Sequence, residues 1–186
     1  MDIVARARGL ILDPRTEWGR IAPEGGAPMD HFRAYAVPMA AIPAVAGFIG
    51  ALAFGRLGFF VWVAVLVAVL SYALSLLSVY VLAKLIEAIA PSFGGVADPL
   101  SAMKLSVYSP TAAWLAGVFS IVPALGILGL LGLYSIYIYW VGVPAMARVP
   151  DERRLAFTAV LVIVAIVVNV LIGAAVGLVV GALLLR

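Results

Sequence analysis

Few side chains in this sequence could carry out chemistry. There is a single histidine, His31, and there is no cysteine and no HExxH motif. No pair of carboxylates lies within a long apolar run, so the general acid and base of a hydrolase have no place there. A lone histidine beside an apolar run is typical of a polar residue at a membrane interface. We therefore expect no enzymatic activity, no cofactor and no bound metal.

One polar stripe does lie within an apolar run. Three serines recur at helical spacing, and a lysine and a glutamate one turn apart could form an ion pair after them. An ion pair inside the membrane would bind or gate something, whereas a pair at the interface would be ordinary; both interpretations remain open. The serines could likewise bond between helices or line a path. The candidate cluster comprises Ser71, Ser75, Ser78, Tyr80, Lys84 and Glu87.

The longest charge-free stretch runs from Leu105 to Ala147. As one helix it would extend roughly 65 Å, about twice the ~30 Å thickness of the hydrocarbon core of a bilayer. Pro123 stops a helix and Gly126 permits a reversal. The stretch therefore predicts a helical hairpin that turns at residues 122–126.

The composition indicates an integral membrane protein. Hydrophobic residues make up 66% of the 186 residues, charged residues 11%, and the mean hydropathy is +1.20. Soluble domains are about half apolar and a quarter charged. No basic stripe with interleaved aromatic residues is present, so nucleic acid is not an expected partner. The expected partner is the lipid bilayer.

We predict an all-α integral membrane fold with five transmembrane helices behind an amphipathic cytoplasmic segment. Residues 1–32 form the N-terminal segment and residues 33–186 form the transmembrane domain. Pro38 and Pro43 are expected to interrupt the first span. The predicted spans are 34–54, 57–83, 106–122, 125–146 and 155–182.

Within the N-terminal segment, residues 1–12 have an apolar face that could lie in the membrane interface or pack on the bundle. Asp13 and Pro14 are typical of a helix start. Trp18 is expected to be an interface anchor. A second aromatic group is expected at the interface for the same reason, and it consists of Tyr134, Tyr137, Tyr139 and Trp140.

The last span carries small residues at every fourth position. This pattern allows two helix backbones to approach closely, with an amide bonding across the seam. We favour a partner helix in the same chain because the other spans also carry glycines; a homo-oligomer is the alternative. The helix-packing stripe comprises Ala165, Asn169, Gly173, Gly177 and Gly181.

The distribution of basic residues predicts the orientation. With five spans and a cytoplasmic N-terminus, ten Lys and Arg residues lie inside and only Arg56 and Arg186 lie outside. Such an excess is the positive-inside pattern. The C-terminus is then expected outside. The inside residues are Arg6, Arg8, Arg15, Arg20, Arg33, Lys84, Lys104, Arg148, Arg153 and Arg154.

Several short motifs, in their order and spacing, resemble the bacterial branch of the Yip1 family of five-span membrane proteins. They are Asp13-Pro14-Arg15-Thr16-Glu17-Trp18, Ala90-Pro91-Ser92-Phe93-Gly94-Gly95, Val107-Tyr108-Ser109-Pro110, Ile121-Val122-Pro123, Tyr134-Ser135-Ile136-Tyr137, Gly142-Val143-Pro144 and Pro150-Asp151-Glu152. The resemblance covers nearly the whole chain. It implies five helices, a cytoplasmic N-terminus and a bacterial inner membrane.

In eukaryotes the same family is tied to Rab GTPases and vesicle traffic. The Asp-Leu-x-Gly-Pro motif of those trafficking members is missing here. The resemblance therefore carries over no Rab partner, and the family offers no catalytic residue to transfer.

Two functions follow as hypotheses. The first is a membrane adaptor or organiser that acts through helix packing and holds a protein partner through its cytoplasmic N-terminus. The alternative is a small transporter, channel or lipid-handling protein, because broken helices line substrate sites in transporters. The helix-breaking residues are Pro38, Pro43, Pro110, Pro123 and Pro144.

Overall fold

The computed structural model describes residues 2–54 and 61–184, and every regular element in this part of the chain is a helix. The predicted start of the second span at Leu57 and the outside charges Arg56 and Arg186 lie outside the described residues. The elements are α1 Ile3–Leu12, α2 Pro14–Ile21, α3 Pro28–His31, η1 Phe32–Ala36, α4 Val37–Phe54, α5 Val61–Ile89, η2 Ala90–Phe93, α6 Pro99–Tyr108, α7 Thr111–Ala116, η3 Gly117–Ile121, η4 Pro123–Leu133, α8 Tyr134–Met146 and α9 Asp151–Leu184.

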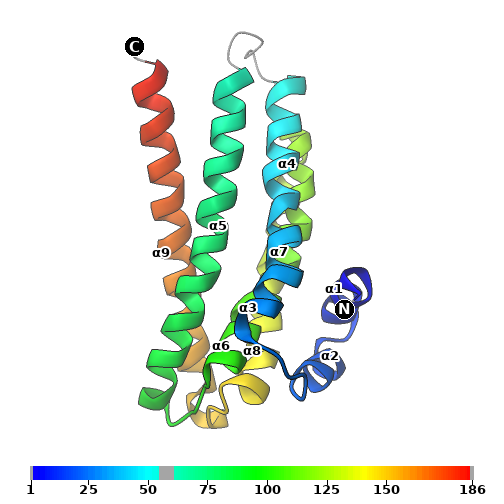
Figure 1. Cartoon of the computed structure of the whole chain (residues 1–186), viewed down its shortest axis with the longest axis vertical. Coiled ribbons are helices and arrows are strands. Elements are labelled where there is room, and N and C mark those ends of the chain that lie inside the picture. Colours follow the sequence, from blue (N-terminus) through cyan, green and yellow to red (C-terminus); the bar gives the residue numbers. More distant parts are fainter. Residues whose placement is uncertain (1, 55–60, 185–186) are drawn as a thin grey trace.

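Four helical stretches of the described chain are long and apolar enough to cross a membrane. They correspond to four of the five predicted spans, and the long helices α4, α5 and α9 stand side by side in Figure 1. The fold is therefore an all-helical one with four candidate membrane-spanning helices. Their bounds are Pro28–Phe54, Val61–Phe93, Pro123–Met146 and Asp151–Ala182.

The predicted span 106–122 is not among these four. It is built from the end of α6, from α7 and from η3, and the α-helix is interrupted at Ser109 and Pro110. Pro110 lacks a backbone N–H and so removes one hydrogen bond of the helical pattern at this point. The segment therefore never forms one long helix, which sequence hydropathy alone could not reveal.

The predicted reversal after this segment is present. Val122 has an extended backbone, with φ −114° and ψ 111°, between the two 3₁₀ helices η3 and η4. The chain then returns alongside itself, since the backbone N–H of Ala113 donates to the Ser135 hydroxyl at 2.9 Å. A 3₁₀ helix rises about 2.0 Å per residue, so the arms are longer than α-helices of equal residue number.

The expectation that Pro38 and Pro43 interrupt the first span is wrong. The helix continues from α3 through the π-helical turn η1 into α4, and Pro43 lies inside α4. In this turn the N–H of Val37 bonds to the carbonyl of Phe32, five residues back. The wider turn absorbs the irregularity just before Pro38 without ending the helix.

Glycines set the closest contact between α4 and the first arm of the hairpin. A Cβ at Gly50 would lie 2.5 Å from the carbonyl oxygen of Ser120, and one at Gly117 would lie 2.5 Å from Cβ of Pro43. Only glycine allows the two backbones to approach this closely.

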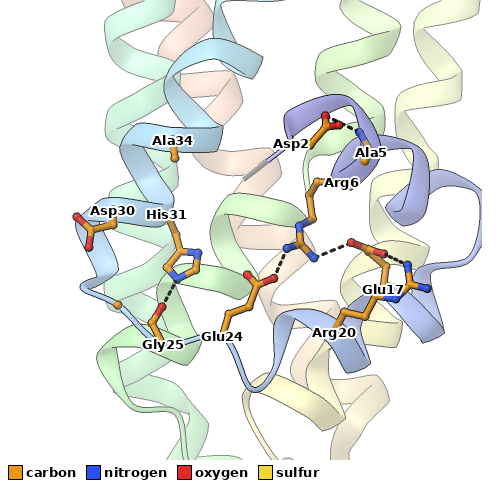
Figure 2. Close-up of a pocket in the computed structure, with 11 residues that line it drawn as sticks. Asp2, Ala5, Arg6, Glu17, Arg20, Glu24, Gly25, Asp30, His31 and Ala34 are labelled. Atoms are coloured by element: carbon orange, nitrogen blue, oxygen red, sulfur yellow. Dashed lines mark hydrogen bonds and ion pairs between the residues drawn. The ribbon is translucent and has the colours of Figure 1, made fainter.

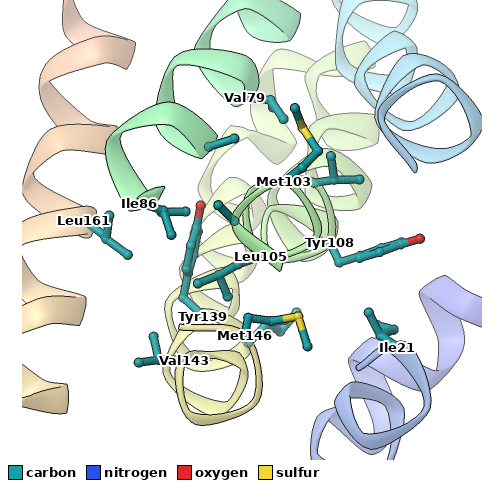
Figure 3. Packing of buried hydrophobic residues seen from close by; sticks show 14 of the residues in the cluster. Ile21, Val79, Ile86, Met103, Leu105, Tyr108, Tyr139, Val143, Met146 and Leu161 are labelled. Carbon is teal, nitrogen blue, oxygen red and sulfur yellow. The ribbon is translucent and has the colours of Figure 1, made fainter. Parts of the chain in front are cut away.

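The described charged residues gather at one end of the molecule. They fall in residues 2–33, 84–104 and 148–154, which lie in the lower half of Figure 1. A buried apolar cluster from α2, α5, α6, α8 and α9 fills this end (Figure 3). Toward the other end, α5, η4 and α9 expose large aliphatic side chains, as lipid-facing helices do.

Candidate functional site

Trp18 attaches the N-terminal segment to the bundle. Asp13 caps α2 by accepting from the N–H of Thr16, and this helix directs Trp18 inward, where it is 1% exposed. Its indole N–H donates to the carbonyl of Ile138 at 3.0 Å. A Cβ at Gly142 would lie 2.5 Å from the indole ring, so the ring lies directly on the α8 backbone. The helix start is confirmed, whereas the expected interface anchor is instead a buried contact.

Lys104 provides a second attachment. It is 1% exposed, and its ammonium donates to the carbonyls of Ile21 at 3.0 Å and Ala22 at 3.3 Å, and to that of Glu24. The carbonyls of Ile21 and Ala22 lie at the C-terminal end of α2, where a cation complements the helix dipole. Burial lowers the pKa of Lys104, and the Glu24 and Asp98 carboxylates oppose that effect.

Arg6 joins α1 to α2 and to the following loop. Its guanidinium donates to the Glu17 carboxylate at 2.6 Å and to the Glu24 carboxylate (Figure 2). The same guanidinium lies 5.6 Å from the centre of the Tyr108 ring. Arg20 approaches the other oxygen of Glu17 at 3.2 Å. The buried Glu17 carboxylate is thus held between two arginines.

His31 is buried and structural. Its Nε2 faces the carbonyl of Gly25 at 3.2 Å, and its Nδ1 faces the hydroxyl of Tyr108 at 2.9 Å. A carbonyl can only accept, so Nε2 carries a proton and donates it to Gly25. The single histidine ties the 22–27 loop to α6, and it is not a polar residue exposed at an interface.

A polar cavity of about 670 Å³ lies among these groups, and we call it the polar cavity. Its acidic and basic side chains mostly pair with one another, as Figure 2 shows. Among the described residues, no group of three His, Cys, Asp or Glu side chains could hold a metal ion. The arrangement is suited to fixing the N-terminal segment on the bundle. The lining residues are Asp2, Ala5, Arg6, Glu17, Arg20, Glu24, Gly25, Gly26, Asp30, His31 and Ala34.

The structure does not bring the six residues of the candidate polar cluster into one site. The predicted pairing of Lys84 with Glu87 is present at 2.9 Å, with the lysine exposed. Ser75 and Ser78 instead line a second cavity of about 820 Å³ among α5, α9 and the hairpin, which we call the membrane cavity. Ser71 and Tyr80 are not among its lining residues.

The residues of the helix-packing stripe of α9 also fall into two groups. Asn169 lines the membrane cavity and donates to the carbonyl of Ala165 in its own helix at 2.8 Å. At Gly173, Gly177 and Gly181, a Cβ would meet no atom within 4 Å. The favoured partner helix within the same chain is therefore wrong for these three glycines.

Sequence reasoning missed two residues. Lys104 was counted only as an inside charge, although it is the single charge in an otherwise uncharged helix and must find acceptors once that helix is buried. Tyr139 was assigned to an interfacial group with Tyr134 and Tyr137. Those two are exposed, whereas Tyr139 is buried and lines the membrane cavity.

Long apolar helices with the described charges at one end define a multi-pass helical membrane protein. The sequence profile of the Yip1 domain matches residues 8–173. The chain therefore belongs to the Yip1 domain family. Neither a curated protein nor a solved structure matches the chain significantly.

Proposed function

We propose that this chain is a non-enzymatic adaptor or organiser in the membrane. In this proposal residues 1–32 form a fixed cytoplasmic segment on a five-helix transmembrane domain, residues 33–186. The observation that carries the proposal is the double attachment of α2, through Trp18 to Ile138 and through Lys104 to the end of α2. A segment held this way presents one defined surface to a partner.

Five passes, with the N-terminus in the cytoplasm and the C-terminus outside, fit this arrangement. The pass that is not one of the four long helices would be residues 106–121, the third in chain order. At about 1.5 Å per α-helical and 2.0 Å per 3₁₀ residue, this segment rises roughly 26 Å, close to the ~30 Å required. The family resemblance and the basic residues at the α1–α2 end favour the inner membrane of a bacterium, with that end inside.

The surface offered to a partner carries three exposed arginines among exposed carboxylates. Arg8, Arg15 and Arg20 are exposed on α1 and α2, as are Asp2 and Asp13, whereas the Glu17 carboxylate is buried. A cytoplasmic protein surface with acidic groups opposite these arginines is the complementary partner. The other polar groups that could support catalysis are engaged, since His31 and Glu17 both have structural partners.

Photocrosslinking in cells tests the adaptor proposal. A photoreactive residue at Arg15 should give a discrete protein adduct, and Arg8→Glu in the same chain should weaken it because an exposed arginine is replaced by a carboxylate. The same photoreactive residue at Val170, on the apolar part of α9, is the control. Deleting residues 1–32 would be a poor test because it uncovers the Trp18 contact on Gly142. Equal adducts at Arg15 with and without Arg8→Glu would contradict the proposal.

A further inference from the structure

The membrane cavity has the size of a ligand site and no charge in its described lining. Its volume of about 820 Å³ lies within the ~300–1,000 Å³ range of small-molecule pockets. Aliphatic side chains and glycines form most of the wall, from Pro43 on α4 to Val170 on α9. An occupant must therefore present an uncharged, largely apolar body to this wall.

The cavity opens sideways rather than toward the charged end. Helix α9 packs against α5 and α8, whereas η4 packs against α7 and η3. Leu130 and Leu133 of η4 and Val170 of α9 line the cavity and remain exposed. In a membrane these exposed side chains face lipid, so an occupant enters from the bilayer.

Several hydroxyl and amide protons in the lining are already used within the protein. Ser78, Ser106 and Ser120 donate to the carbonyls of Ser75, Val79 and Gly117, and the Asn169 amide donates within α9. Ser135 accepts from a backbone N–H. These hydrogen bonds stabilise the helices and are not free for a ligand.

Tyr139 is a buried lining residue whose hydroxyl proton is not used. It is 7% exposed, and its hydroxyl has no hydrogen-bond partner among the described residues. Figure 3 shows its ring between Ile86 and Leu105, with the hydroxyl pointing away from α8. The nearby Ser106 hydroxyl donates to Val79 instead. A buried donor without an acceptor costs free energy, which a ligand oxygen would recover.

We propose that the membrane cavity binds an ester-linked phospholipid, with the Tyr139 hydroxyl donating to an acyl ester carbonyl. The acyl chain lies along the aliphatic wall, and the charged headgroup lies outside the cavity, because the described lining carries no charge that could pair with a phosphate.

This proposal does not depend on the adaptor function. The membrane cavity and the polar cavity share no lining residue, so either function could fail alone.

Native mass spectrometry of the detergent-solubilised chain can test the assignment. The chain is titrated with a diacyl phosphatidylglycerol and with the dialkyl ether lipid of the same headgroup and chain length, which lacks the carbonyls. We expect about 5–10-fold tighter binding of the ester lipid, equivalent to about 1–1.4 kcal/mol for one hydrogen bond. Tyr139→Phe should abolish this preference and still fold, because the hydroxyl has no partner to lose.

Two further variants control the result. Tyr137→Phe, on the exposed side of α8, should keep the ester preference. Gly129→Phe should weaken both lipids, because Gly129 lines the cavity with open space around its Cβ. Equal binding of the two lipids by the wild type, an ester preference retained by Tyr139→Phe, or unchanged binding by Gly129→Phe would overturn the proposal. So would displacement of the ester lipid by an equal concentration of an isoprenoid quinone.

Discussion

Substituting Gly142 by alanine should loosen the N-terminal segment from the bundle. The added Cβ would lie 2.5 Å from Cε2 and 2.6 Å from Cζ2 of Trp18, and 2.9 Å from Cδ1 of Leu105. Both side chains are buried, so neither can swing into open space. The strain therefore falls on the contact that holds α2 against α8.

The magnitude follows from two competing costs. Expelling the indole would lose about 4–6 kcal/mol of burial, taking about 150–250 Å² at about 25 cal/mol per Å², and about 1 kcal/mol for its hydrogen bond. Overpacking a core costs about 1–3 kcal/mol. Because the second cost is smaller, the ring should stay in place under strain. The docked state then loses about 1–3 kcal/mol, and the undocked population rises about 5–150-fold.

Limited trypsin digestion measures that population. Arg15 and Arg20 are exposed on α2, and their cleavage should follow the open fraction when opening and closing are fast. Cleavage should accelerate in Gly142→Ala but not in Gly126→Ala, where the Cβ meets no atom within 4 Å. Trp18→Leu should destabilise the docked state less in the Gly142→Ala background than in the wild type, because the two substitutions affect one contact. Wild-type cleavage rates in Gly142→Ala would refute the reasoning.

Two more predictions concern Lys104 and α9. Lys104→Met should lower unfolding stability by about 1–3 kcal/mol because it leaves the α2 carbonyls without a donor; thermal melts measure the loss. The pKa of Lys104 in the folded protein is below its usual 10.5, so the unfolded chain binds more protons just below pH 10.5. The contribution of Lys104 to the free energy of unfolding should therefore rise with pH in that range, and Lys104→Met should remove the rise. Gly177→Ala should not destabilise the monomer in detergent, whereas Gly132→Ala, whose Cβ would lie 3.1 Å from Cα of Ala113, should; loss of stability at Gly177 would reveal a contact that the single chain does not contain.

Hydropathy and the residues that start or stop helices were enough to predict much of the fold. Long charge-free runs fixed the four long helices, and Pro123 placed the reversal at Val122. The α2 cap followed from Asp13 and Pro14 because capping depends on neighbouring residues alone. Local rules of this kind can be applied to a single sequence.

Contacts between distant segments could not be predicted in the same way. Trp18 lies 120 residues from Ile138, and an aromatic residue near a span looks the same in sequence whether it faces lipid or a glycine on another helix. Tyr139 and the exposed Tyr137 are tyrosines two positions apart in the same apolar stretch, so the sequence does not distinguish the buried one.

Cysteine accessibility tests the central claim that the N-terminal segment and the turn of the hairpin lie on opposite sides of the membrane. The sequence contains no cysteine, so Arg15→Cys and Ala124→Cys each introduce a single exposed thiol. In intact cells a membrane-impermeant maleimide should label Ala124→Cys at once and Arg15→Cys only after the membrane is permeabilised. Labelling of both thiols from the same side would contradict the account.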